Sequence, residues 1–230
     1  MKTIGILGGM SWESTQSYYA AINQGIKAKL GGLHSAKIVL VSVDFAEIEV
    51  LQAEGKWKEA AILLAHAAKQ VEAAGADCLL IATNTMHKVA DEITSAIGIP
   101  LLHIADATAK ALLDDGVQRV GLLGTRFTMQ ESFYSSRLIN LGVNEVITPS
   151  LVEQAEINRI IYDELCCGTV TLASRALYQN AIKNLKQQGA EAVILGCTEI
   201  GLLIQNTDSC LPLYDTTAIH AESAVAFALT

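Results

Sequence analysis

A chain of 230 residues that is 51% hydrophobic and 17% charged can bury one large core or two modest ones. Its formal net charge of −8, with no run of Lys or Arg, argues against nucleic acid and anionic membranes as partners. No segment approaches the roughly 20 apolar residues of a membrane span, and the first residues lack the apolar length of a signal peptide.

Short apolar runs alternate with helical patterns along the whole chain. We predict strands, in chain order, at 3–7, 38–43, 78–82, 101–103, 119–123, 146–148, 192–195 and 211–214. Between the second and third of these, residues 56–74 have apolar side chains at helical spacing and precede Gly75, a typical helix stop. The same pattern recurs at 172–188 before Gly189, and a last helix is predicted at 218–229. Strands and helices in alternation indicate βαβ units and a parallel sheet.

The chain also repeats itself. Residues 75–77 lead into an apolar strand that ends at Thr83-Asn84-Thr85, and residues 189–191, each 114 positions later, lead into one that ends at Cys197-Thr198-Glu199. We therefore predict an α/β fold of two pseudo-symmetric, doubly wound parallel-sheet sub-domains, with the active site in the cleft between them. The first half comprises 1–100 and 211–230, whose last strand and helix return to complete it, and the second comprises 101–210.

The repeat places polar side chains at the carboxyl ends of predicted strands, where parallel sheets bind their ligands. Thr83, Cys197 and the loops at 8–11 and 124–125 all lie at such ends. The loop Gly8-Gly9-Met10-Ser11 matches neither the dinucleotide fingerprint nor the Walker motif. It therefore indicates close backbone approach to a carboxylate rather than to a nucleotide.

Of the five cysteines, only Cys197 has a polar sequence around it. At the entry to a helix its thiol would meet backbone N–H groups and the positive end of the dipole, which lower a thiol pKa. A small buried hydrophobe is the alternative interpretation. Cys78 lies in an apolar run and is expected in the core, and Cys166, Cys167 and Cys210 are expected to be structural or surface thiols. No CxxC or Cys/His ligand spacing occurs, so we expect a reduced, cytoplasmic protein without a metal.

Thr83 ends the strand that matches the one before Cys197. Its hydroxyl donates and accepts hydrogen bonds but does not ionise near neutral pH, so it is a poor base. Capping the next helix is the alternative role, and it is compatible with carboxylate binding at the same place. His87, four residues further on, could line the cleft. For the other histidines we expect packing or surface roles: His34, His66, His103 and His220.

Three motifs together resemble the aspartate/glutamate racemase family: LGGMSWEST at 7–15, TNTMH at 83–87 and GCTE at 196–199. The likeness runs from the first strand to the last helix and is nearest to enterobacterial racemases of broad or L-Asp/L-Glu specificity. It implies a homodimeric enzyme that works without pyridoxal phosphate or metal, with two cysteines flanking the α-carbon of an amino acid. One thiolate removes the α-proton and the other thiol returns a proton on the opposite face, which is what inversion requires.

Carried over by motif, Cys197 matches the second family cysteine, which acts on the L-enantiomer, and Thr83 stands in place of the first. Gln52 falls where aspartate-preferring relatives place a basic residue, and a neutral amide contacts a side-chain carboxylate without requiring one. We expect backbone N–H groups around 84–85 and 198–199 to hold the carboxylate of the carbanion-like state. The remaining positions that match cleft-lining residues of the family are Met10, Asn84, Thr85, Thr125, Thr198 and Glu199.

The leading hypothesis is therefore a racemase that inverts L-Asp, L-Glu or a broader set of free L-amino acids. Cys197 is the base, and Thr83, alone or through water, supplies the proton on the other face. Because Thr83 is a poor base, we expect slower turnover from D to L. Two alternatives remain open. One is a single-cysteine enzyme similar to arylmalonate decarboxylases, and the other is an amino-acid-binding protein without turnover.

Overall fold

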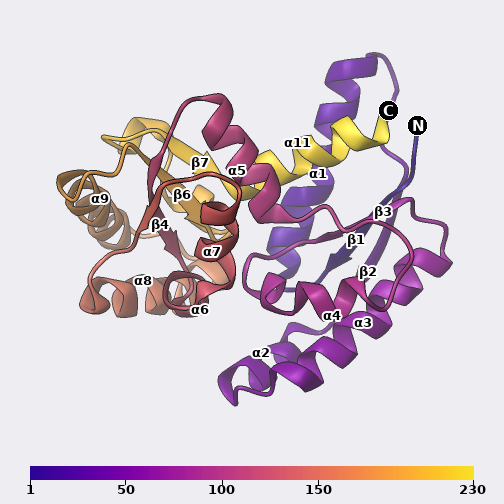
Figure 1. Ribbon diagram of the computed structural model, residues 1–230, viewed down its shortest axis with the longest axis horizontal. Coiled ribbons are helices and arrows are strands. Elements are labelled where there is room, and N and C mark those ends of the chain that lie inside the picture. The colour runs from indigo at the N-terminus through magenta and orange to yellow at the C-terminus, as the bar shows by residue number, and fades with distance from the viewer. The chain divides into compact units, whose positions relative to one another are not determined.

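The computed structural model describes residues 1–230 and divides into two compact units, Met1–Ile104 with His220–Thr230, and Ala105–Ile219. Each unit holds one sheet whose neighbouring strands are all parallel, in the order β2-β1-β3 and β5-β4-β6-β7 (Figure 1). The strands are β1 (Ile4–Gly8), β2 (Ile38–Ser42), β3 (Cys78–Ile81), β4 (Arg119–Gly124), β5 (Glu145–Ile147), β6 (Ala192–Gly196) and β7 (Leu213–Asp215). The predicted α/β class with two parallel-sheet sub-domains is confirmed.

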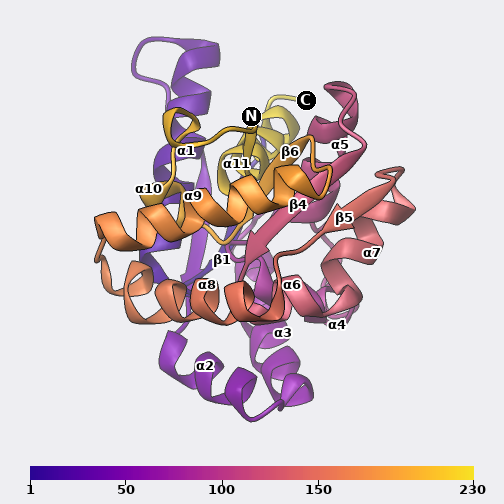
Figure 2. The same ribbon diagram turned by 90° about the vertical axis from the view of Figure 1, so that its left-hand side faces the viewer.

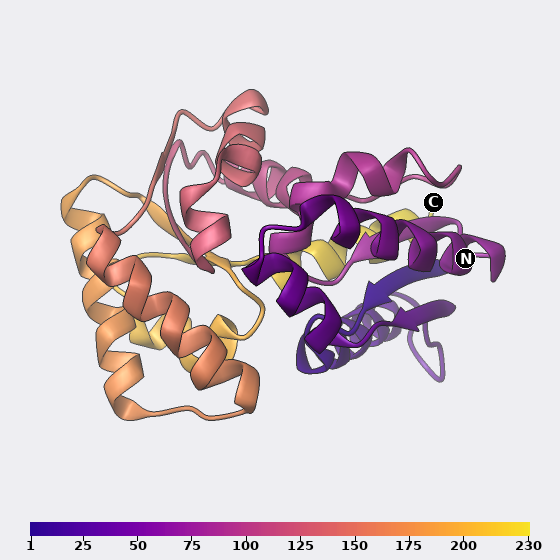
Figure 3. The same cartoon turned by 90° about the horizontal axis from the view of Figure 1, so that it is seen from below.

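The first sheet is covered on both faces, as its fully buried central strand requires. Ile4 and Ile6 face a core shared with α1 and α11, whereas Leu7 faces a second core shared with α2 and α3. Figure 3 shows the indigo helix α1 and the purple helix α3 on opposite sides of strand β1. The helices packed in this unit are α1 (Trp12–Leu30), α2 (Phe45–Ala53), α3 (Trp57–Ala73), α4 (Ala90–Thr94) and most of α11 (Thr216–Ala228).

In the second sheet, Leu123, Val193 and Leu195 face a core formed with α8 and α9, the two helices that cross in front of the sheet in Figure 2. Helix α8 begins with a capping box, in which Ser150 and Glu153 each bond the other's backbone N–H. The helices of this unit are α5 (Ile104–Asp114), α6 (Arg126–Gln130), α7 (Ser132–Asn140), α8 (Leu151–Asp163), α9 (Leu172–Gln187) and α10 (Ile200–Leu203). No helix in the structure is both long and apolar enough to cross a bilayer.

Matched glycines allow a helix to touch an inner strand of each sheet. A Cβ on Gly5 would lie 2.4 Å from Val71 Cγ1 of α3 and 2.5 Å from the Cys78 carbonyl oxygen. A Cβ on Gly121 would lie 2.8 Å from Leu185 Cδ1 of α9. The backbone oxygen of Cys78 leaves no room for a side chain at Gly5, and at Gly121 the end of the Leu185 side chain would have to shift. Glycine therefore lets the helix pack closely in both units.

Two predicted strands differ from the structure. Residues 101–103 form no strand, because Leu101 makes only one bridge to Leu79 before the chain enters α5 at Ile104. The predicted strand at 211–214 does not complete the first half. As β7 it pairs with β6 in the second sheet, since the short connection through α10 brings it back beside β6, and the chain rejoins the first unit only at His220.

Candidate active site

The loop after β1 is fixed to the carboxyl end of β3. Thr15 Oγ1 accepts the Gly9 N–H at 2.8 Å and donates to the Ser11 carbonyl at 2.9 Å. Ser14 Oγ donates to the Ala82 carbonyl at 2.8 Å, one residue before Thr83. Gly9 itself has a φ of +91°, and a Cβ there would lie 2.2 Å from the Val43 carbonyl oxygen. The loop at 8–11 and the end of β3 therefore lie together at the carboxyl edge of the first sheet.

Thr83 lies half-buried between β3 and the 3₁₀ turn Thr85–Val89. The N-cap residue of this turn is Asn84, not Thr83, and no side chain makes a capping hydrogen bond there. Asn84 and Thr85 are both buried, at 2% and 4% exposure. The polar cluster predicted at this strand end is therefore present, and the capping interpretation of Thr83 is wrong.

Gln52 joins the same edge from α2. Its amide Nε2 lies 2.9 Å from Met86 Sδ, in the turn that follows Thr83. Met10 and Met86 belong to one apolar cluster beneath the edge. The structure thus brings together the predicted residues of the first half: Met10, Gln52, Thr83, Asn84 and Thr85.

The carboxyl edge of the second sheet has the same backbone plan. Gly124 and Gly196 are register partners at the ends of β4 and β6, so Thr125 and Cys197 leave the sheet side by side. A Cβ on Gly124 would lie 2.9 Å from the Gly196 carbonyl oxygen, which keeps these two strand ends in contact. Thr125 caps α6 by accepting the Thr128 N–H.

A thiol and a carboxylate form the chemical centre of this second edge. Cys197 Sγ donates to Glu199 Oε2 at 2.9 Å, and Thr198 Oγ1 donates to the same oxygen at 2.8 Å. Glu199 is 4% exposed, so water does not compete freely for these bonds. The predicted residues of the second half, Thr125, Cys197, Thr198 and Glu199, therefore also lie at one edge.

The pKa of Cys197 is shifted opposite to the sequence prediction. Burial raises the pKa of the thiol well above its ordinary value, and the negative charge of Glu199 raises it further. The expected lowering by a helix dipole was wrong because α10 has only four residues. Cys197 is thus held as a thiol whose proton is already donated toward a carboxylate.

The other thiols show no such arrangement. Cys78 is buried in the first core, and burial raises its pKa to about 11. Cys167 and Cys210 are exposed, and Cys166 packs against the core beside Cys197. No three or more His, Cys, Asp or Glu side chains are grouped so that they could hold a metal ion.

Sequence reasoning gave no role to Asp215, an acidic group at the second edge. Asp215 ends β7, pairs in register with Leu195 of β6, and accepts the Thr217 N–H at 2.8 Å. Burial raises the pKa of its carboxyl. A Cβ on Gly201 of α10 would lie 3.1 Å from Asp215 Oδ2, so the carboxylate sits against the helix that follows Cys197. An Asp at a strand-to-helix junction was the available signal.

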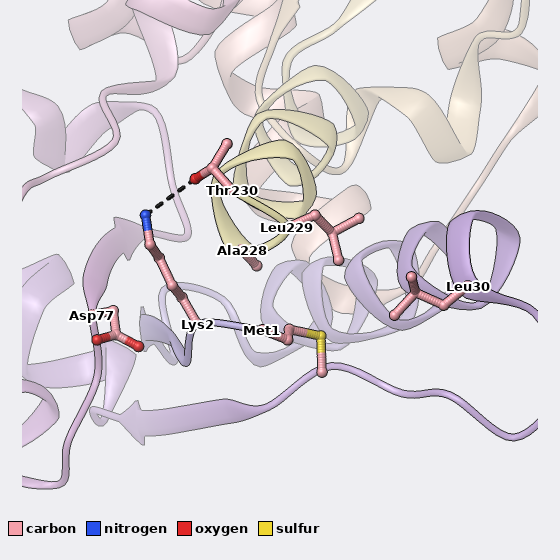
Figure 4. A pocket seen from close by; sticks show the side chains of 7 residues that line it. All are labelled: Met1, Lys2, Leu30, Asp77, Ala228, Leu229 and Thr230. Atoms are coloured by element: carbon pink, nitrogen blue, oxygen red, sulfur yellow. Dashed lines mark hydrogen bonds between the residues drawn. The ribbon is translucent and has the colours of Figure 1, made fainter.

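A separate hollow of about 450 Å³ lies at the opposite, amino end of the first sheet (Figure 4). Lys2 crosses it, donating from Nζ to Thr230 Oγ1 at 3.1 Å and lying 4.2 Å from the Phe227 ring centre. Its lining consists of Met1, Lys2, Leu30, Asp77, Ala228, Leu229 and Thr230. None of these is a predicted site residue, so this hollow is not the candidate active site.

Comparisons with known proteins bear on the chemistry of the two edges. A family model described as Asp/Glu/Hydantoin racemase matches residues 7–224. The broad specificity amino-acid racemase RacX of Bacillus subtilis is 30% identical over 158 residues, which is 69% of this chain and 67% of RacX. A candidate Asp/Glu racemase structure from Yersinia pestis is 55% identical with a TM-score of 0.93. An aspartate racemase homologue from Pyrococcus horikoshii is 35% identical with a TM-score of 0.87, and both structures match over 100% of each chain.

Proposed function

The chain belongs to the Asp/Glu/hydantoin racemase family and is an amino-acid isomerase, and we propose that it inverts the α-carbon of free L-Asp, L-Glu or a broader set of L-amino acids without pyridoxal phosphate or metal. The observation that supports this most directly is the hydrogen bond from the Cys197 thiol to the buried Glu199 carboxylate. The family, the broad specificity of RacX and the neutral amide of Gln52 support a substrate range wider than aspartate alone.

In the proposed reaction, Glu199 accepts the thiol proton and the Cys197 thiolate then removes the α-proton of the L-substrate. The Cys197 S–H bond is re-formed, and the electron pair of the broken C–H bond stays on the substrate as a carbanion-like state. Backbone N–H groups around 84–85 and 198–199 hold its carboxylate. Thr83, directly or through a water, protonates the opposite face, and solvent restores its proton while Glu199 releases one.

The unequal pair predicts unequal rates. A threonine hydroxyl does not ionise near neutral pH, so removal of the α-proton from the D-enantiomer is slow and kcat from D to L is low. Because enantiomers have equal free energy, kcat/KM must be the same in both directions, and KM for the D-substrate must be lower by the same factor. Exchange of the α-proton of the L-enantiomer at Cys197 does not require inversion, so the equality of kcat/KM does not limit its rate.

The test is α-proton exchange followed by NMR in heavy water, with L-Asp, L-Glu, D-Asp and D-Glu and with a wider panel. We expect the L-enantiomers to incorporate deuterium faster than they invert and the D-enantiomers to exchange slowly. Equal exchange of D-Asp and L-Asp would refute the assigned roles. Binding of L-Asp without any exchange, unchanged in Cys197→Ser, would favour a binding protein instead.

The homodimer and the cytoplasmic location implied by the sequence resemblance remain part of this proposal. Light scattering on the purified chain and fractionation of cells that produce it would test them.

A further inference from the structure

Three histidines that are distant in the sequence meet in the interior of the first unit. The His87 and His103 ring centres are 4.4 Å apart, and those of His87 and His220 are 6.0 Å apart. Exposure is 3% for His87 and 0% for His220. Buried ring nitrogens are costly unless they are hydrogen-bonded, so their partners decide what the cluster does.

His87 bonds backbone groups through both ring nitrogens. Nδ1 lies 2.8 Å from the Thr83 carbonyl oxygen, and Nε2 lies 3.3 Å from the Ile104 amide nitrogen. A carbonyl can only accept and an amide N–H can only donate, so Nδ1 carries the proton and Nε2 accepts. His87 is therefore a neutral ring in one tautomer that joins Thr83 to Ile104.

His220 holds the same segment from the opposite direction. Its Nε2 lies 2.7 Å from the Leu102 carbonyl oxygen, and its Nδ1 lies 2.8 Å from the hydroxyl of the buried Tyr18. The carbonyl can only accept, so Nε2 donates to Leu102; in a neutral ring Nδ1 then carries no proton and accepts from the Tyr18 hydroxyl. The segment around Ile104, which His87 uses as its anchor, is thus itself fixed by α11 and α1.

These hydrogen bonds hold the backbone of Thr83 in place. It lies outside both β3 and the turn at 85–89, so regular secondary structure does not fix its peptide group. The preceding carbonyl, that of Ala82, is held by Ser14, and the Thr83 carbonyl is held by His87. We propose that His87 is a positioning residue that sets the orientation of Thr83, and through it the delivery of a proton to the substrate face opposite Cys197.

This inference rests on the role given to Thr83 in the proposed function. It differs from the sequence expectation that His87 lines the cleft, because both ring nitrogens are committed to backbone partners. A displacement of about 1 Å in a reacting group can cost about 10²-fold in rate. Loss of the bond to Thr83 should therefore lower inversion while leaving chemistry at Cys197 in place.

The two bonds of His87 can be separated by amide variants. In His87→Asn the amide nitrogen takes the place of Nδ1 and can still donate to Thr83, whereas in His87→Gln the amide oxygen takes the place of Nε2 and keeps only the bond to Ile104. The readouts are kcat and KM for inversion of L-Asp, and exchange of its α-proton in heavy water. His66→Gln, at an exposed histidine of α3, is the matched control.

We expect His87→Gln to lower kcat for inversion by about 10- to 100-fold, with KM and L-Asp exchange within about threefold of the unaltered protein. His87→Asn should keep most of the inversion rate, and His66→Gln should keep all of it. Equal losses in the Asn and Gln variants, or parallel losses of exchange and inversion, would overturn the inference.

Thr83→Ala, measured beside these variants, separates the two levels of the argument. If Thr83→Ala inverts L-Asp at the unaltered rate, the role of Thr83 is wrong and this inference falls with it. If Thr83→Ala loses inversion while His87→Gln retains it, only the positioning role of His87 is wrong.

Discussion

Glu199→Gln is the substitution that tests the thiol–carboxylate pair most directly. The two residues are joined by a 2.9 Å hydrogen bond, and Glu199 is 4% exposed, so no bulk water stands ready to replace the carboxylate as proton acceptor. A positioned general base is worth about 10²- to 10⁴-fold in rate, which corresponds to about 2.7–5.4 kcal/mol. We expect the rate of α-proton exchange of L-Asp at Cys197 to fall by a factor in this range, and NMR in heavy water would measure it.

The same variant should lower the pKa of Cys197, which favours the thiolate while the proton acceptor is lost. The Glu199 charge is one of the causes that raise the pKa of Cys197, so its removal shifts the pH dependence of iodoacetamide alkylation to lower pH. Exchange should fall although the thiolate becomes easier to form, because a Gln side chain cannot accept the thiol proton. Glu191→Gln, which neutralises an exposed carboxylate at the residue before β6, is the control and should cost little. A Glu199→Gln protein with full activity would refute the reasoning.

Three further predictions follow from single contacts. Thr83→Cys restores a thiol opposite Cys197 and should raise kcat for D-Asp at least about tenfold, as chiral chromatography would show. Thr85 is the repeat counterpart of Glu199, so adding Thr85→Glu should raise kcat further. No gain in either variant would count against the assigned pair. Gly5→Ala places a Cβ 2.4 Å from Val71 and should destabilise the first unit by about 1–3 kcal/mol in thermal melts, whereas Gly98→Ala meets only a flexible Glu72 oxygen at 3.1 Å and should not. Hydrogen bonds from the Gln118 N–H and, to a smaller extent, the Arg119 N–H hold the pKa of Glu191 below its ordinary value of 4.5. The ionised carboxylate therefore stabilises the fold above pH 4.5, and this stabilisation is lost as the pH falls through the lowered pKa. Denaturant melts of Glu191→Gln should accordingly show a weaker decline of stability on acidification.

Much of the fold was predictable because the repeat is written in local sequence. An apolar run bounded by glycine identifies β1, β3, β4 and β6 within one or two residues, since strand burial and helix approach leave a local signature. The sheet to which a strand belongs has no such signature. The segment at 213–215 reads as a strand on its own, and only its pairing with β6 assigns it to the second sheet.

The proximity of the candidate site residues within each unit was predictable, but the electrostatics around them were not. Cys197 and Glu199 are two residues apart, so their proximity could be inferred from the sequence. The rise in the Cys197 pKa depends on burial by α8, α9 and neighbouring side chains, which no local pattern reveals. The histidine cluster was missed for a related reason, since His87, His103 and His220 come from three separate segments and acquire meaning only through their backbone partners.

The two units share a backbone plan and differ in how each prepares its reacting group. The strand end after β6 supplies a thiol with a buried carboxylate beside it, an arrangement in which the carboxylate can take the thiol proton and leave a thiolate base. The matching end after β3 supplies a hydroxyl, with Thr85 where the other unit has Glu199, and a histidine, His87, that bonds the Thr83 carbonyl oxygen. A group that gives up a proton once per turnover needs orientation more than a base, whereas a group that takes one needs the base. In the proposed reaction, the difference between the halves follows the direction of proton transfer from an L-amino acid. On that proposal, a proton acceptor at Thr85 would be required before the first half could remove a proton as readily as the second.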